Sequence, residues 1–164
     1  TISPNPLTRI NLLSYICKKN IKMSKGFYNV PKAINEPVKE YKKDSSERIE
    51  VLNEYRKMYN SNIDIPMYIG DKKVFTKDKR NLVPPHDHKH IIGTANYGEE
   101  KNVEDAIAAA MKAQKNWSNM SWEHRASIFL KAADLLAGPF RSKLNAATMI
   151  GQSKNVIQSE IDAA

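Results

Sequence analysis

The chain has 164 residues, of which 41% are hydrophobic and 27% charged, as is ordinary for one globular domain. None of its apolar runs approaches the ~20 residues that a membrane-spanning helix needs, so we predict no membrane association. Most of the net charge of +8 lies in the first 35 residues, which hold six basic side chains and no acidic one. The other 129 residues carry 20 basic and 18 acidic groups, and this near balance argues against a nucleic-acid partner.

Residues 1–32 form a basic arm that is rich in Ser, Asn and Leu and free of acidic side chains. This composition is typical of a mitochondrial transit peptide. The alternatives are a disordered basic tail and a leader that is foreign to the native protein. The single cysteine, Cys17, falls in this arm. It has no partner for a disulfide and no base positioned to activate it, so we expect an inert thiol.

After the arm, the sequence predicts a linker, one helix and three short strands. Residues 24–44 lack sustained periodicity and are predicted to form an extended linker. Ser45 or Ser46 can cap a helix that ends near residues 60–62. Residues that favour strands, separated by turn signals, then predict strands at three places. These are residues 65–69, residues 73–76 after a turn at Gly70–Lys72, and residues 90–96 after a break at Pro84–Pro85.

The second half of the chain has helical periodicity throughout, and we predict four helices there. Asn102 is the expected N-cap of the first, and Gly138–Pro139 and Gly151 are the expected stops of the second and third. The predicted ranges are Val103 to about Trp117, Trp122–Leu136, Phe140–Ile150, and a last helix from about Asn155. That helix has no stop signal before Ala164, so we expect the chain to be a fragment.

Motifs that carry chemistry are absent or weak. The run His86–His90 holds three histidines and an aspartate, which are residue types that ligate zinc or copper. Two prolines precede the run, Lys89 interrupts it, and no fourth ligand is signalled, so we interpret it as a loop leading into a strand. The six glycines are too scattered for a phosphate-binding loop, and no G-x-S-x-G motif occurs. We expect no catalytic, cofactor-binding or metal-binding residue in the chain.

Residues 103–117 are similar to the first long helix of aldehyde dehydrogenases, and residues 125–136 resemble the second. Four segments resemble the pyrroline-5-carboxylate dehydrogenase branch of that family. They are Ala33–Val38, the 65–75 hairpin, residues 85–90 and residues 148–164. The match keeps one register from Ala33 to Ala164. It implies an α/β fold for residues 33–164: the N-terminal part of an NAD-binding domain, with a linker, a helix, short antiparallel strands and several helices. That part is an incomplete Rossmann-like domain.

The same resemblance implies NAD-dependent oxidation of glutamate semialdehyde, the open form of pyrroline-5-carboxylate, to glutamate in proline catabolism. In the family a cysteine thiolate attacks the aldehyde, hydride passes to NAD, and water releases the acid. The catalytic Cys and Asn and the NAD-binding segments are expected beyond Ala164, so we expect the fragment alone to be inactive. The full-length protein is expected to act on this small-molecule substrate in the mitochondrial matrix, as a homo-oligomer. The alternatives are a non-catalytic truncated product or oligomerisation module, and an aldehyde dehydrogenase with another substrate.

Overall fold

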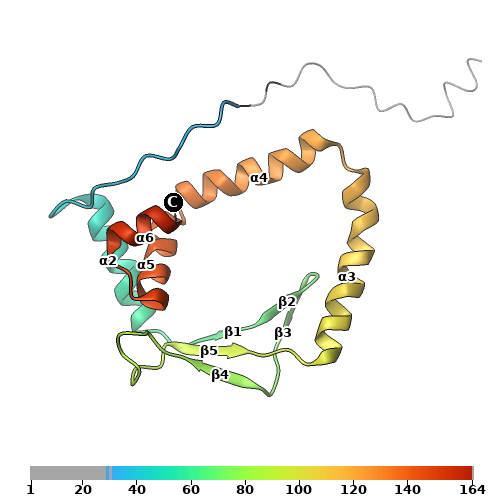
Figure 1. Cartoon of the computed structure of the whole chain (residues 1–164), viewed down its shortest axis with the longest axis horizontal. Coiled ribbons are helices and arrows are strands. Elements are labelled where there is room, and N and C mark those ends of the chain that lie inside the picture. The colour runs from blue at the N-terminus through green and yellow to red at the C-terminus, as the bar shows by residue number, and fades with distance from the viewer. Residues whose placement is uncertain (1–28, 30, 164) are drawn as a thin grey trace, which may run out of the picture. The chain divides into compact units, whose positions relative to one another are not determined.

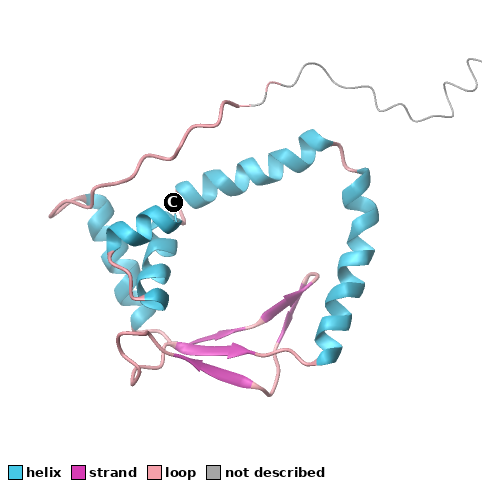
Figure 2. Ribbon diagram, in the orientation of Figure 1, coloured by secondary structure: helices cyan, strands magenta, loops and turns pink. Residues whose placement is uncertain are grey.

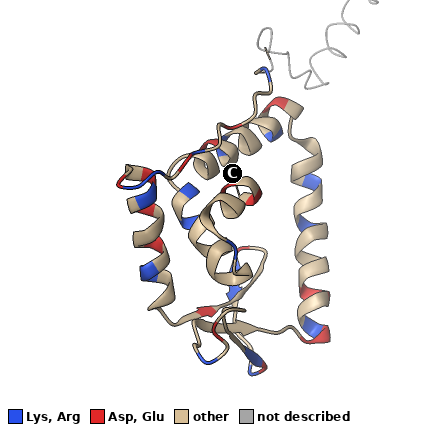
Figure 3. Cartoon of the chain, turned by 60° about the vertical axis from the view of Figure 1, so that its left-hand side comes forward, with Lys and Arg blue, Asp and Glu red and all other residues tan. Residues whose placement is uncertain are grey.

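A computed structural model describes residues 29 and 31–163 of the chain, and residues Ile34–Ala164 form one compact unit (Figure 1). Residues 1–28, which contain Cys17 and most of the basic arm, lie outside the described residues. Residues 31–40 belong to no helix or strand, as expected of a linker. Charges of both signs are interspersed along the described helices (Figure 3).

The first helix, α2 (Ser46–Tyr59), begins where its cap was predicted. Ser45 is the N-cap, and its hydroxyl accepts a hydrogen bond from the backbone N–H of Arg48 at 3.4 Å. This bond satisfies one of the amides that the first helical turn leaves without a partner. The helix ends at Tyr59, and its C-cap is Asn60, within the predicted range.

Five short strands follow, where the sequence predicted three. They are β1 (Ile63–Ile65), β2 (Met67–Ile69), β3 (Lys72–Val74), β4 (Lys79–Leu82) and β5 (Gly93–Asn96). The predicted strand at residues 65–69 is wrong as a single element, because Pro66 lies between β1 and β2. Proline has no N–H to donate to a strand ladder, so the chain leaves one sheet and enters another at this residue.

The strands form two small sheets (Figure 2). β2 and β3 make the predicted antiparallel hairpin, with Met67 opposite Val74. The other sheet has the order β1-β5-β4, in which β4 is antiparallel to β5 and β1 is parallel to it. The expectation of antiparallel strands alone is therefore corrected by the β1–β5 pair. The polar strand β4 escaped prediction because it is an edge strand with three exposed residues, so no apolar alternation marks it.

Four helices complete the unit: α3 (Glu100–Asn119), α4 (Trp122–Ala137), α5 (Arg141–Gln152) and α6 (Val156–Ala163). Asn102 is not the N-cap of α3, because the helix begins two residues earlier. The Asn102 side-chain oxygen accepts a hydrogen bond from the backbone N–H of Glu99 at 2.9 Å. The predicted stop of α5 at Gly151 is also wrong. The helix continues to Gln152, and its C-cap is Ser153, which adopts the left-handed conformation with φ 54°.

The buried core lies where α2, α5 and the linker meet, and it is small. Tyr41, Val51 and Ala146 are its buried members. Helices α3 and α4, in contrast, bury none of their residues, and Ile107 and Phe129 are 59% and 67% exposed. No helix in the described part of the chain is long and apolar enough to cross a membrane.

The close approach of β1 and β5 requires glycine at position 93. A Cβ atom there would lie 2.2 Å from the carbonyl oxygen of Ile63, on the neighbouring strand. We expect Gly93→Ala to force the two strands apart and to lower the stability of this sheet by roughly 1–3 kcal/mol. Amide hydrogen exchange in β1 and β5 measures this loss.

Gly151→Ala is the matched control. A Cβ atom at Gly151 would meet nothing within 4 Å, and the residue lies inside α5. Alanine is favoured over glycine in a helix, so this variant should be more stable by about 0.5–1 kcal/mol. Equal exchange rates in β5 for Gly93→Ala and the unsubstituted chain would contradict this account of the sheet.

Candidate functional site

The histidine run lies in a loop between β4 and β5, and its polar groups bind neighbouring elements. The loop was predicted, but the strand predicted from His90 begins only at Gly93. His90 Nε2 lies 2.6 Å from the backbone oxygen of Tyr59, at the end of α2. His86 Nδ1 lies 2.7 Å from Ser153 Oγ, and its Nε2 lies 3.3 Å from the Tyr55 hydroxyl. Among the described residues, no group of three or more His, Cys, Asp or Glu side chains could hold a metal ion. These histidines join the loop to α2 and to the end of α5.

Tyr59 is the centre of this contact. Its ring stacks on His90, with ring centroids 4.1 Å apart, and its hydroxyl donates a hydrogen bond to Asp87 Oδ2 at 2.7 Å. This bond raises the pKa of Tyr59 and lowers the pKa of Asp87. Both shifts favour the uncharged phenol and the charged carboxylate, which are the forms that hold the loop in place.

The contact between Ser153 and His86 resembles a nucleophile beside a base, an arrangement that serine hydrolases use. Ser153 is the C-terminal cap of α5, and the shallow cleft around the pair also holds Lys154. An acyl-transfer site further needs hydrogen-bond donors directed at the developing oxyanion. Of the other polar side chains that line the cleft, Tyr55 is hydrogen-bonded to His86 and Lys154 is paired with Asp162. We interpret the pair as the connection that secures the end of α5.

A second polar cluster is buried, and it surrounds the carboxylate of Glu160 in α6. The Arg141 side chain is 3% exposed and that of Glu160 is 0% exposed, and the two form an ion pair. Arg141 Nε lies 3.1 Å from Glu160 Oε1. Asn145, one turn further along α5, donates from Nδ2 to Glu160 Oε2 at 2.6 Å. Because Arg141 and Asn145 are four residues apart, they lie on the same face of α5 and reach the same carboxylate.

The remaining hydrogen bonds to the Glu160 carboxylate come from the linker. The Tyr41 hydroxyl donates to Oε2 at 2.6 Å, and the backbone N–H of Lys39 donates to Oε1 at 3.0 Å. Burial raises the pKa of Glu160, but the hydrogen bonds from Arg141, Tyr41 and the Lys39 amide outweigh it and lower the pKa to about 2. Burial and the bond to Glu160 raise the pKa of Tyr41 to about 12.

These pKa shifts decide what the cluster can do chemically. A general base must pick up a proton near the working pH, and Glu160 remains a carboxylate far below neutral pH. The hydrogen bonds to Glu160 also raise the pKa of Arg141, which therefore stays charged. The cluster is a fixed ion pair that joins α5, α6 and the linker, and it is not an acid–base site.

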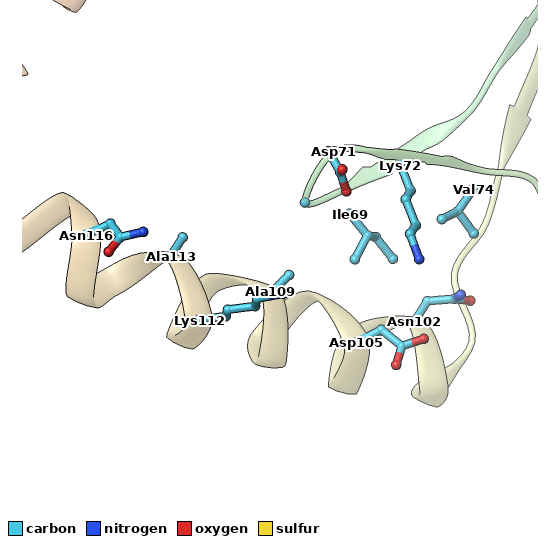
Figure 4. Close-up of a pocket in the computed structure, with 11 residues that line it drawn as sticks. Ile69, Asp71, Lys72, Val74, Asn102, Asp105, Ala109, Lys112, Ala113 and Asn116 are labelled. Atoms are coloured by element: carbon cyan, nitrogen blue, oxygen red, sulfur yellow. The ribbon is translucent and has the colours of Figure 1, made fainter.

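Two clefts lie beside the small sheets. The first, of about 580 Å³, lies between α3 and the β2–β3 hairpin (Figure 4). Ile69, Lys72 and Val74 point from the hairpin toward the helix, and Asp105 and Lys112 line the helix side. The second, of about 490 Å³, lies between α2, α5 and the β1-β5-β4 sheet and is mostly apolar. Neither cleft is lined by a cysteine or a histidine.

Sequence reasoning found the histidine loop but missed Glu160 and Arg141. Glu160 stands in an amphipathic helical pattern in which any single acidic residue would be read as exposed. Its partner Tyr41 is 119 residues away along the chain, and no local motif signals such a pairing.

Comparison with known proteins places these elements in a family. The model of the aldehyde dehydrogenase family matches residues 75–164, more than half of the chain. The delta-1-pyrroline-5-carboxylate dehydrogenase named as mitochondrial from Danio rerio is 42% identical over 130 residues, covering 79% of this chain and 23% of the relative. That from Rattus norvegicus, also named as mitochondrial, is 38% identical over 161 residues, covering 98% and 28%. The chain thus spans about a quarter of the length of these relatives.

Solved structures agree. The delta-pyrroline-5-carboxylate dehydrogenase from Mycobacterium tuberculosis bound with NAD has a TM-score of 0.83 and 40% identity, covering 85% of this chain and 26% of that one. A Thermus thermophilus 1-pyrroline-5-carboxylate dehydrogenase variant has a TM-score of 0.76 and 27% identity. The predicted α/β fold, part of an aldehyde dehydrogenase domain, is confirmed by this likeness. So is the resemblance to the pyrroline-5-carboxylate dehydrogenase branch.

The buried carboxylate leads to a stability prediction. Glu160→Gln keeps the shape of the side chain but removes its charge, which leaves Arg141 buried beside a neutral amide. We expect a loss on the order of 3 kcal/mol in the free energy of unfolding, measured by urea titration with circular dichroism. Asp162→Asn is the matched control, because Asp162 lies in the same helix and pairs with Lys154 at the surface. An exposed pair contributes about 0–1 kcal/mol, so a similar loss in both variants would contradict the special role of Glu160.

The same pair predicts a dependence on pH. The pKa of Glu160 is about 2 in the folded chain, below its ordinary value of 4.5. Its contribution to stability is therefore complete above about pH 4.5 and is lost as the pH falls toward 2. Between these limits the stability of the unsubstituted chain should rise with pH more steeply than that of Glu160→Gln.

Proposed function

The chain belongs to the aldehyde dehydrogenase family, and we propose that the whole protein oxidises L-glutamate 5-semialdehyde to L-glutamate with NAD. The semialdehyde is the open form of 1-pyrroline-5-carboxylate, so the reaction is a step of proline catabolism. The observation that supports this substrate is the identity of 38–42% to relatives named for it, over most of the described chain. The NAD in the Mycobacterium tuberculosis structure supports the cofactor.

The proposal extends to location and assembly. Several relatives are named as mitochondrial, and residues 1–32 have the composition of a mitochondrial transit peptide. We therefore place the whole protein in the mitochondrial matrix, with residues 1–32 as the targeting arm and residues 33–164 as the N-terminal part of the family domain. Within the matrix it acts on a small-molecule substrate and assembles as a homo-oligomer.

The described residues do not fit the cofactor themselves. A dinucleotide binds where a strand leads through a glycine-rich turn into a helix, whose N-terminus faces the pyrophosphate. At the β5–α3 connection, Glu99 and Glu100 occupy that N-terminus, and their carboxylates would repel a phosphate. Gly98 in this turn serves packing instead, since a Cβ atom there would lie 3.1 Å from Met67 Sδ.

We accordingly assign no catalytic, cofactor-binding or metal-binding role to any residue that the structure describes. Its contribution to the enzyme is structural: it provides the helices and small sheets against which other parts of a family domain can pack. The exposed apolar side chains of α3 and α4 suit such a role, because buried apolar area is what stabilises packing between parts of a domain.

An assay of the whole protein tests the proposal. We expect NADH formation with glutamate semialdehyde, at a kcat/KM about a hundredfold above that for an unsubstituted aliphatic aldehyde, because polar groups of a specific site reject a substrate that lacks their partners. The control is the 164-residue chain alone, which should form no NADH. A whole protein that binds NAD but does not oxidise the semialdehyde would contradict the substrate. Turnover by the 164-residue chain would contradict the absence of a site.

A further inference from the structure

Residues Glu36–Tyr41 form a segment without regular structure whose polar groups reach the buried ion pair, and we call this segment the strap. Residues 36–40 are exposed, whereas Tyr41 at its end is 4% exposed and belongs to the core. An exposed segment outside any helix or strand is ordinarily dispensable and open to proteolysis. The strap differs from such a segment in its hydrogen bonds to buried groups.

The strap supplies partners to both members of the ion pair. Arg141 Nη1 donates to the Glu36 carboxylate at 2.5 Å, and Nη2 donates to the backbone oxygen of Pro37 at 2.6 Å. The Lys39 amide and the Tyr41 hydroxyl donate to Glu160, as described above. Without these groups, each charge would be left with only part of its hydrogen bonds, which is a costly state for a buried charge.

The backbone at Tyr41 is further evidence that these contacts are strong. Tyr41 has a φ of 52°, in the left-handed region that bulky side chains rarely adopt. Such a conformation costs on the order of 1–3 kcal/mol and persists only where the surroundings over-determine it. Here the Tyr41 ring packs in the core with Val51 and Ala146, and its hydroxyl binds Glu160.

We propose that the strap is a fixed part of the folded protein, and that a protease that removes the basic arm must cleave the chain before Glu36. Removal means hydrolysis of one peptide bond by an endoprotease, with one water consumed. Residues 31–35 are exposed and lie in no helix or strand, so a protease can reach them. Cleavage beyond Tyr41 would remove all four strap donors and acceptors from Arg141 and Glu160. The reason for removing the arm rests on the proposed mitochondrial location, but the requirement for the strap does not.

Trypsin cleaves after lysine, so the rates at which it cleaves two peptide bonds of the full chain can be compared directly. The Lys32–Ala33 bond lies ahead of the strap and the Lys39–Glu40 bond lies within it. We expect cleavage after Lys32 to be at least about tenfold faster than after Lys39, once each rate is divided by its rate in the urea-unfolded chain. Equal normalised rates would overturn the proposal.

Truncation tests the energetic requirement. A chain that starts at Ala33 should keep the amide hydrogen exchange of α5 and α6 within about twofold of the full chain. A chain that starts at Lys42 should exchange these amides roughly a hundredfold faster, because the buried pair has lost its partners. Unchanged exchange in the chain that starts at Lys42 would overturn the proposal.

A point variant covers the case in which the shorter chain does not fold. Tyr41→Phe removes only the hydroxyl that binds Glu160 and should speed exchange in α5 and α6 roughly tenfold. Tyr68→Phe is the control, since Tyr68 is 68% exposed, and it should leave exchange unchanged. Exchange in Tyr41→Phe equal to that in Tyr68→Phe would contradict the proposal. None of these ratios depends on turnover, so a failure of the enzyme assay and a failure of the strap are distinguishable.

Discussion

The ion pair of Arg141 and Glu160 is buried with almost no access to water, and this constraint governs how the described elements meet. Moving two charges out of water costs several kcal/mol each, which is offset only when every hydrogen-bonding group of the pair has a partner. Arg141 comes from α5, Glu160 from α6, and the remaining partners from residues 36–41. None of these elements can satisfy the pair alone, so they must be in place together.

The apolar core around α2 and α5 is small. Only Tyr41, Val51 and Ala146 form the buried cluster there, although partly buried side chains such as Leu52 and Met149 surround them. The ion pair adds little net stability compared with an apolar core of equal volume. Its effect is on specificity, because any other arrangement of the linker and α6 would leave a buried charge without partners.

The sequence was sufficient to predict the elements that are determined by residues close together in the chain. The Ser45 cap and the β2–β3 hairpin are each set by a few neighbouring residues, and both were predicted. The predictions from sequence fail where residues far apart in the chain determine the structure. β4 exists because β5 pairs with it, and α5 passes Gly151 and ends only at Gln152. Glu160 is the extreme case, since its linker partners Tyr41 and Lys39 lie 119 and 121 positions away along the chain. The loop at His86–His90 was recognised, but its hydrogen bonds to α2 could not be derived from spacing.

The central claim is that Arg141 and Glu160 act as one energetically coupled unit, and a double-mutant cycle tests it most directly. Arg141→Met, Glu160→Gln and the double variant are compared by urea unfolding of the full chain at neutral pH. The account gives a coupling energy of roughly 3 kcal/mol, with the double variant much less destabilised than the sum of the two single changes. A coupling energy near zero would show that the two charges contribute independently, and would contradict the account.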